Sequence, residues 1–411
     1  MAVPTTGHQP ASSSPPSGRQ AQAQAHRQAH NRRKTRAELL SSALRQSETD
    51  RVDALPVQHP HAAGIDIGSR SHWVCAGFTT EAASGSIREF PAHTAGLKAI
   101  AAFLREHQVD TVALESTGIY WIPLYELLQA EGFEVLLVDP SYTHQLRGRP
   151  KTDRRDCQWI YRLHSVGLLA AAFRPDEKTC QLRAYLRQRA NLIRSASRHV
   201  QHMQKALEQM NLKLTEVLSD ITGLTGKTII RAILRGTRAP EKLAKYRDKG
   251  CKASEAEIAE ALTGSYREEH LFELKLAYEA WQFCLGQMGK VDGQIALQLG
   301  RMKGDRALPP LKPKARPKRR ANSPRFDARE ALYYVVGLDL TEVEGISELT
   351  ALTVISEIGP GVSRFATVQK FCSWLGLCPN WRKTGGRVRS SRTRRGVNRA
   401  ARALRVAAQA A

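Results

Sequence analysis

Three features are scarce in this 411-residue sequence: paired cysteines, long apolar segments and acidic residues. The seven cysteines are scattered and form no CxxC pair, which argues against a disulfide framework or a zinc site and favours a reducing compartment. No apolar run of about eighteen residues occurs, and the first residues contain no apolar segment typical of signal peptides. We therefore expect a cytoplasmic protein with no membrane span and no secretory signal.

The shortage of acidic residues leaves a large positive charge. Lys and Arg number 62 against 39 Asp and Glu, which gives a formal net charge of +23 at pH 7. An excess of this size predicts a polyanionic partner, with nucleic acid ahead of a membrane surface as the candidate. At ~100–200 residues per domain, the chain has room for two or three domains.

Composition divides the chain into five parts. The first is rich in Ser, Pro, Gln, Ala and His with almost no apolar periodicity, which predicts a disordered arm. An α/β pattern follows, then a helical region, a linker that prolines keep extended, and a second small domain. The predicted boundaries are 1–60 for the arm, 61–172 for the α/β domain, 173–305 for the helical or coiled-coil region, 306–330 for the basic Pro-rich linker and 331–411 for the C-terminal domain.

The α/β domain contains short apolar runs that predict strands, separated by turns and by amphipathic stretches that predict helices. The element order is βββαβαβα, which predicts a mixed sheet with helices packed on it and with the first and fourth strands as neighbours. The expected strands are Gly64–Ile67, His72–Phe78, Ser86–Phe90, Thr111–Glu115 and Phe133–Val138, and the expected helices are Ala95–His107, Tyr120–Glu131 and Asp153–Leu169.

The remaining regions are predicted to be mainly helical. Apolar residues recur at spacings near three and four over residues 176–300, which indicates an extended helical hairpin or coiled coil. This region is interpreted as a spacer, with direct nucleic-acid contact as the alternative. Further on, Val343–Gly359 is a helix bracketed by glycine turns, similar to a helix-hairpin-helix, and further helices are expected over Phe365–Leu377 and from Asn398.

A basic stretch lies in the C-terminal domain. From Arg382 to Arg405 there are ten basic residues and no acidic ones. Such a run is usually a solvated face, but glycines and hydroxyl residues in an expected loop favour phosphate binding here. The candidate nucleic-acid-binding residues are Arg382, Lys383, Gly385, Gly386, Arg387, Arg389, Ser390, Ser391 and Arg392.

Four acidic residues of the α/β domain carry the candidate chemistry. Asp66 stands in an apolar strand, where a carboxylate is costly unless it meets a cation or a metal. It is a metal ligand, a phosphate-site residue or a cap for the following turn. Glu115 ends the fourth strand, next to the first, while Asp153 and Asp156 are three apart and share one helix face.

These four carboxylates would repel one another strongly without a cation. Oxygen ligands suit Mg²⁺ or Mn²⁺, and two ions ~3.5–4 Å apart are the usual device for phosphodiester chemistry. Taken singly, Asp153 and Asp156 are more often a helix cap and a first-turn partner of the helix dipole. As a set, in a chain of charge +23, the four acids predict a two-metal site that acts on nucleic acid.

Several motifs together resemble a known family. They are GIDIGS (64–69), ALESTGIYW (113–121), KTDRRD (151–156), SWLGLCP (373–379) and TGGRVRSSRTRR (384–395), and a strand ending Val138-Asp139-Pro140 accompanies them. They are similar to the DEDD transposases of the insertion sequence 110 type, and more closely to the 1111 subgroup. The resemblance covers about residues 62–411.

The resemblance implies a RuvC-like, RNase H-fold catalytic domain, a coiled-coil connector and a C-terminal transposase domain. It implies DNA strand cleavage and exchange in the bacterial cytoplasm at the nucleoid, guided by a structured RNA from the element, by a homo-oligomer that is a dimer or a tetramer. By motif match it assigns Asp66, Glu115, Asp153 and Asp156 as the metal-binding tetrad. Arg382, Arg387 and Arg389 would stabilise the developing phosphate charge.

The chain departs from the family at two places. The family has a nucleophilic serine before a glycine, where this chain has Thr384, so the expected nucleophile is Thr384 and then Ser390, with a defective site as the third alternative. The sequence also stops at Ala411 inside an expected helix, which leaves open an intact enzyme or a truncated, inactive copy.

Three other functions stay open at this stage. A RuvC-like nuclease would use only the acidic residues and water to cut branched DNA. A sugar-kinase or actin-like ATPase would use the Asp-Ile-Gly-Ser turn (66–69) for nucleotide phosphates, although the chain is too basic and no second glycine-rich loop precedes residue 170. A DNA-binding transposase remnant would have no activity.

Overall fold

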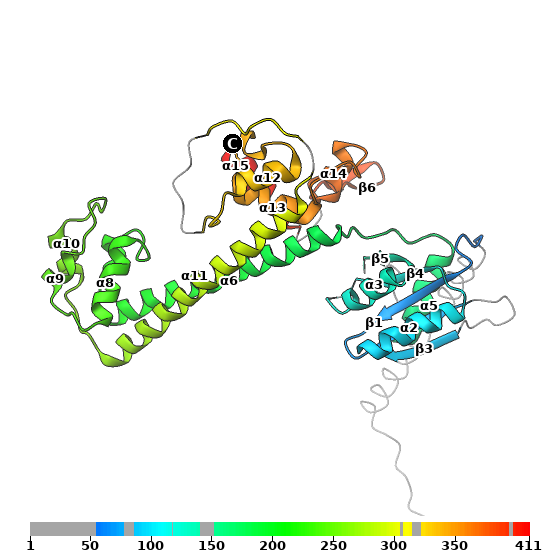
Figure 1. Ribbon diagram of the computed structural model, residues 1–411, viewed down its shortest axis with the longest axis horizontal. Helices are drawn as coiled ribbons and strands as arrows, with labels where there is room; N and C mark the ends of the chain where they lie inside the picture. The colour runs from blue at the N-terminus through cyan, green and yellow to red at the C-terminus, as the bar shows by residue number, and fades with distance from the viewer. Residues whose placement is uncertain are drawn as a thin grey trace, which may run out of the picture. The chain divides into compact units, whose positions relative to one another are not determined.

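The computed structural model describes residues 55–77, 86–116, 118–139, 152–304, 307–314, 322–393 and 398–411. The chain forms two compact units, 1–174 and 175–411 (Figure 1). The predicted arm lies outside the described residues apart from its last few positions, and so do residues 306 and 315–321 of the basic linker. None of the helices in the described ranges is long and apolar enough to cross a bilayer.

The first unit is built on a five-stranded mixed sheet with the order β3-β2-β1-β4-β5. β1 pairs antiparallel with β2 and parallel with β4, so the predicted neighbourhood of the first and fourth strands is confirmed. A mixed sheet with helices packed on it fits an RNase H-like α/β domain. The strands are β1 (Ala62–Ile67), β2 (Ser71–Ala76), β3 (Ser86–Pro91), β4 (Thr111–Glu115) and β5 (Glu134–Val138).

Alternate side chains of the central strands enter two separate cores, as the period of two in a strand requires. Ile65 and Ile67 pack in one core with α2 (Thr94–Glu106) and α3 (Trp121–Ala130). Ala62 and Cys75 pack on α5 (Asp153–Ser165) in another. The helices thus cover opposite faces of the sheet, and α5 has its own face.

α5 lies directly on β1 because Gly64 has no side chain. A Cβ atom at this position would be 2.2 Å from the backbone nitrogen of Tyr161 and 2.6 Å from the carbonyl oxygen of Cys157. Near its C-terminal end, α5 meets the start of β4, where His164 Nε2 lies 3.0 Å from the Thr111 hydroxyl. The helix therefore runs antiparallel to β1, and its first turn lies towards the carboxyl ends of β1 and β4.

The buried His164 should make the protein acid-sensitive. Burial, with His59 stacked on its ring at 5.0 Å, lowers the pKa of His164 from 6.5 to about 4. His164 is neutral in the folded protein and gains a proton on unfolding once the pH is below its usual pKa of about 6.5. The free energy of unfolding therefore decreases as the pH falls from 6.5 towards 4, by ~3 kcal/mol in all. We expect His164→Gln to flatten the fall in unfolding free energy between pH 6.5 and 4, measured by urea titration, whereas the exposed His61→Gln should not. Equal acid slopes for both variants would contradict this.

The second unit begins with two long helices that pack against each other. They are α6 (Glu177–Gln209) and α11 (Glu268–Met302), and Figure 1 shows them side by side over most of their length. The two helices are antiparallel, because the ammonium of Lys178 at the start of α6 donates a hydrogen bond to the carbonyl of Arg301 at the end of α11. The predicted helical hairpin is therefore present.

A helical insert, defined as residues 210–267, joins the two long helices. Its helices are α7 (Leu214–Val217), α8 (Leu224–Leu234), α9 (Pro240–Ala244) and α10 (Glu255–Ala261). Ile229, Ile230 and Leu243 of the insert share one buried core with Met203 and Leu207 of α6. The segment Ile229–Leu234 belongs to α8, so the helical pattern over 176–300 is interrupted by short helices between the two long ones.

A buried ion pair fixes the two long helices to each other. Arg189 of α6 and Asp292 of α11 are 3% and 2% exposed, and Nε of Arg189 donates to Asp292 at 2.5 Å. The second carboxylate oxygen of Asp292 accepts from the backbone N–H of Arg325 at 3.1 Å. Removing one member leaves the other charged group buried.

We expect Asp292→Ala to lower the unfolding free energy by about 3–5 kcal/mol, the usual cost of breaking a buried pair. Denaturant titration measures it. The exposed pair between Lys213 and Glu208 provides a matched control, since Glu208→Ala should leave stability nearly unchanged. A similarly small effect of both substitutions would show that the buried pair does not hold the helices.

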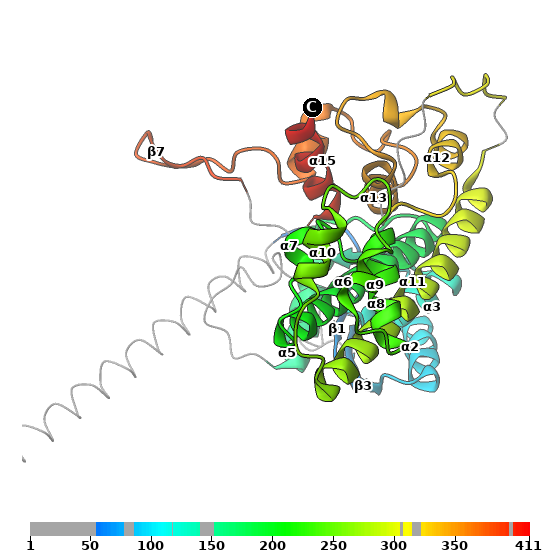
Figure 2. The same cartoon turned by 90° about the vertical axis from the view of Figure 1, so that its left-hand side faces the viewer.

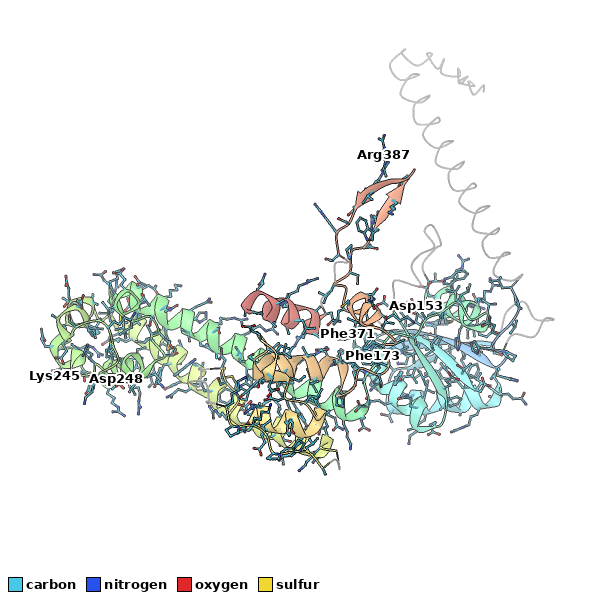
Figure 3. All side chains as sticks on the ribbon, turned by 90° about the horizontal axis from the view of Figure 1, so that it is seen from above. Asp153, Phe173, Lys245, Asp248, Phe371 and Arg387 are labelled. Carbon is cyan, nitrogen blue, oxygen red and sulfur yellow. The ribbon has the colours of Figure 1, made fainter. Side chains whose placement is uncertain are left out.

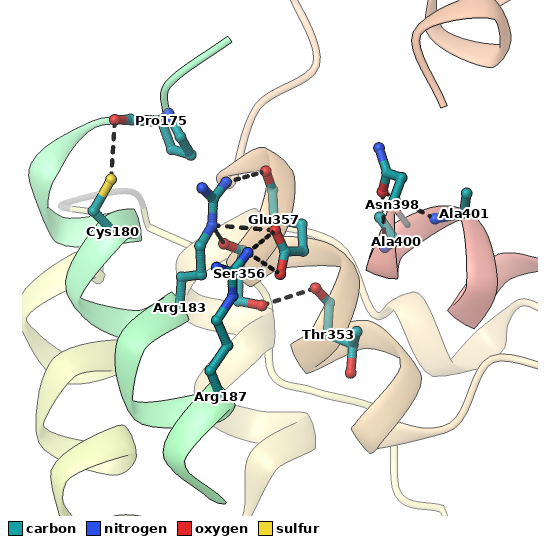
Figure 4. Close-up of polar contacts among 10 residues, drawn as sticks. All are labelled: Pro175, Cys180, Arg183, Arg187, Thr353, Ser356, Glu357, Asn398, Ala400 and Ala401. Carbon is teal, nitrogen blue, oxygen red and sulfur yellow. Dashed lines mark hydrogen bonds and ion pairs between the residues drawn. The ribbon is translucent and has the colours of Figure 1, made fainter. Parts of the chain in front are cut away.

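The C-terminal part of the second unit is mostly helical. The predicted helix over Val343–Gly359 is present but begins later, as α13 (Glu348–Ile358), and the glycines on either side of it, Gly345 and Gly359, have φ of +76° and +86°. Arg183 and Arg187 of α6 both contact the carboxylate of Glu357 on α13 (Figure 4). The helices are α12 (Ala328–Val336), α13 (Glu348–Ile358), α14 (Val368–Trp374) and α15 (Arg399–Ala410), with a short 3₁₀ turn over Leu340–Glu342.

The basic stretch after α14 is a β-hairpin, although the sequence predicts a loop. β6 (Arg382–Thr384) pairs antiparallel with β7 (Arg387–Ser390). Gly385 and Gly386 form the turn, with φ of +56° and +76°, and positive φ at both central residues is the mark of a type I′ hairpin turn. Figure 2 shows β7 extending away from the helices of its unit.

Candidate functional site

Two of the predicted acids lie on neighbouring strands at the same edge of the sheet. The parallel register pairs Ile65 with Leu114, so Asp66 and Glu115 are the next pair along, at the carboxyl ends of β1 and β4. By alternation, both side chains lie on the face that α5 covers. Glu115 is 9% exposed and Asp66 is half-buried.

The other two acids begin α5. Asp153 and Asp156 are in its first turn, where carboxylates interact favourably with the helix dipole, and Figure 3 labels Asp153. Asp153 is exposed and Asp156 is half-buried. Because α5 runs antiparallel to β1, this turn lies towards the edge that carries Asp66 and Glu115.

A buried thiol lies near one acid of the helix and one acid of the strands. The pKa of Cys157 is raised above its usual range, first by burial and then by the neighbouring Cys75, Asp66 and Asp156. Asp66 and Asp156 therefore both act on the same atom. Cys157 and Cys75 are themselves neutral core thiols, since burial also raises the pKa of Cys75 to about 12.

The donor set is suited to a hard divalent cation. All four predicted ligands are carboxylates, the oxygen ligands that Mg²⁺ and Mn²⁺ prefer. Within the described ranges, no three Asp, Glu, His or Cys side chains are grouped so that they could hold a metal ion. The structure thus brings Asp66 and Glu115 side by side and directs the first turn of α5 towards them, without a closed set of ligands.

The second candidate site is the hairpin of the other unit. Thr384 is the last residue before the turn, and the register pairs it with Arg387. The side chains from Arg382 to Arg389 are exposed, as are Ser391 and Arg392. Ser390 is half-buried, and its hydroxyl accepts a hydrogen bond from the backbone N–H of Arg392 at 3.3 Å.

One residue beside this hairpin was missed by the sequence reasoning. Trp381 is 58% exposed, and the ammonium of Lys383 lies 5.9 Å from its ring centroid. An exposed aromatic ring among cations suits stacking on a nucleobase. The signal was its position directly before the basic stretch.

Comparison with known families decides what kind of protein carries these two sites. A family model of DEDD transposases of the insertion sequence 110 type, described as "Transposase", matches residues 63–212. A second model, described as "Transposase IS116/IS110/IS902 family", matches residues 338–411. The chain belongs to the insertion sequence 110 family of transposases. The comparison with curated proteins gave no match.

Each candidate site of this transposase lies inside one matched segment. The strands apart from Ala62, α5 and the four acids fall in 63–212, and the hairpin falls in 338–411. Transposases act on DNA, so the chain is a DNA-binding protein of a mobile element. Membership of the family also indicates DNA cleavage and strand transfer as its type of activity.

Proposed function

We propose that this transposase cuts and rejoins DNA strands in a reaction that depends on Mg²⁺ or Mn²⁺. The observation that carries the proposal is the register of β1 and β4, which supports Asp66 and Glu115 as adjacent ligands at one sheet edge. Asp153 and Asp156 complete the proposed set from the first turn of α5. Two bound ions would activate the attacking oxygen and the leaving oxygen of a phosphodiester.

The hydroxyl of Thr384 is the proposed nucleophile. Its oxygen attacks the scissile phosphorus, a threonine–phosphate bond forms, and the bond to one sugar oxygen breaks, so that this sugar leaves as a hydroxyl. Arg387, directly opposite in the hairpin, is the nearest guanidinium by register to stabilise the charge that develops on the phosphate oxygens. Arg382 and Arg389 would assist, and the other hairpin residues proposed to hold the DNA backbone are Lys383, Gly385, Gly386, Ser390, Ser391 and Arg392.

The proposal extends to the assembly that performs the reaction. A homo-oligomer, dimer or tetramer, and a structured guide RNA from the element are both part of it, as the family suggests. The test incubates the full chain with donor DNA, target DNA and RNA transcribed from the element. Strand exchange should appear with Mg²⁺ and disappear with EDTA or without the RNA. Strand exchange without the RNA would contradict the proposal that an RNA guides the reaction. No exchange under any condition would favour an inactive DNA-binding remnant.

A RuvC-like nuclease is the second candidate. The acids and the hairpin belong to different compact units, 1–174 and 175–411, so the acidic residues alone could cut DNA with water as the nucleophile. Such an enzyme would cleave branched DNA equally well after Thr384→Ala and would form no covalent intermediate. The transposase proposal requires the opposite result for both measurements.

A further inference from the structure

A pocket of about 420 Å³ lies between α8 of the helical insert and the middle of α11. It is lined by three basic side chains and by no acidic one: Lys227, Arg231 and Arg325. None of these residues belongs to the acidic edge or to the hairpin. The sequence alone favoured a plain spacer for this region.

The three cations come from two segments far apart in the sequence. Lys227 and Arg231 are one turn apart on α8, so they share a face. No ion pair among the described residues involves either of them. Arg325 is held in place, because its Nη2 donates to the carbonyl of Leu285 at 2.8 Å and its backbone N–H donates to Asp292 at 3.1 Å.

The aromatic rings that line the pocket are buried, and glycines of α11 leave space in its wall. Tyr278 and Trp281 are each 6% exposed, so their ring faces are not available for stacking on a base. Gly286 lines the pocket, and a Cβ atom there would meet nothing within 4 Å. At Gly289 a Cβ atom would come within 2.3 Å of the Arg325 guanidinium. Glycine is unfavourable inside a helix, and here the two glycines leave room for a ligand and for Arg325.

We propose that this pocket binds the phosphodiester backbone of duplex DNA. Three cations without a carboxylate fit a phosphate group, and the absence of an accessible ring among the lining residues fits contact with the backbone rather than the bases. Through this pocket the helical insert contributes affinity that does not depend on DNA sequence. The inference rests on the proposed function, since it takes DNA as the substrate.

The first test removes the charge. Each phosphate contact contributes about 0.9 to the slope of log affinity against log salt concentration, so Lys227→Gln with Arg231→Gln should reduce the slope for a 30-base-pair duplex by about 2. The control removes equal charge from the same insert, with Lys242→Gln on α9 and Lys245→Gln at its C-cap, where both side chains are exposed. The control should leave the slope almost unchanged. Equal slopes for both double variants and the unmodified chain would overturn the proposal.

The second test blocks the pocket without changing charge. Gly286→Leu should weaken duplex binding several-fold, whereas Gly293→Leu, at another open glycine of α11 outside the pocket, should not. A parallel arm uses a single-stranded RNA of equal length, and an effect on RNA binding alone would also overturn the proposal.

If the unmodified chain exchanges DNA strands while all pocket variants bind DNA normally, the inference fails and the proposed function stands. If the unmodified chain binds no DNA, the proposed function fails with it.

Discussion

Asp66→Asn should abolish DNA cleavage and strand transfer while the protein stays folded. Asp66 and Glu115 are the adjacent carboxylates at the edge of the sheet, and the amide that replaces Asp66 removes a charge from the proposed metal-binding set. Loss of one preorganised charged or polar group from such a site typically costs ~10²–10³-fold in rate, which we take as the lower limit. The measurement is the initial rate of cleavage of labelled donor DNA across a Mg²⁺ titration.

The matched control is Glu134→Gln. Glu134 is an exposed carboxylate at the start of β5, where it pairs with Thr111. It therefore lies at the amino ends of the parallel strands, opposite to the carboxyl ends that carry Asp66 and Glu115. Its substitution should leave cleavage unchanged. Asp66→Asn should not lower the unfolding free energy, because it relieves repulsion between neighbouring carboxylates. Full cleavage by the folded Asp66→Asn protein would remove Asp66 from the active site.

The arrangement of the acidic edge could be predicted because it depends on local patterns. β1 and β4 are both apolar runs that end at an acid, and three hairpin-linked strands followed by crossover helices make them neighbours. The parallel register that aligns Asp66 with Glu115 follows from where each run begins. The close approach of α5 could not be read in the same way, since it depends on Gly64 meeting residues almost a hundred positions later.

The sequence also could not predict which charged residues pair when they are far apart along the chain. Arg189 and Asp292 are separated by 103 positions, and each stands among other charged residues of an amphipathic helix. Only the antiparallel packing of α6 and α11 identifies this pair as the buried one. The pocket on α8 is of the same kind, because Arg325, which lies inside the predicted linker 306–330, joins Lys227 and Arg231 only through the folding of the chain.

The hairpin shows that a run of basic residues can obscure a turn signal in the sequence. Lys383, Arg387 and Arg389 suggested a phosphate-binding loop and no strand, because strands are usually recognised by apolar alternation. Two consecutive glycines are nevertheless a signal for a type I′ turn. With that turn, the register places Thr384 opposite Arg387, which gives the proposed nucleophile a fixed cationic neighbour that a loop would not.

Thr384→Ala should eliminate the covalent protein–DNA intermediate completely, since no other group supplies the attacking oxygen in the proposed mechanism. Thr384→Ser should retain it, and should form it faster, because serine lacks the methyl group that crowds the hydroxyl. The assay traps the intermediate with a nicked, end-labelled donor DNA and detects the adduct on a denaturing gel.

Ser390→Ala is the internal control for this experiment. The hydroxyl of Ser390 is half-buried and accepts the backbone N–H of Arg392, whereas Thr384 is exposed beside the turn. The adduct should therefore survive Ser390→Ala. An adduct that survives Thr384→Ala and vanishes with Ser390→Ala would move the nucleophile to the other strand of the hairpin. If the unmodified protein forms no adduct but still cleaves DNA, water is the nucleophile and the hairpin serves only to bind phosphate, because exposed guanidinium groups at a fixed register hold a backbone whether or not a hydroxyl beside them reacts.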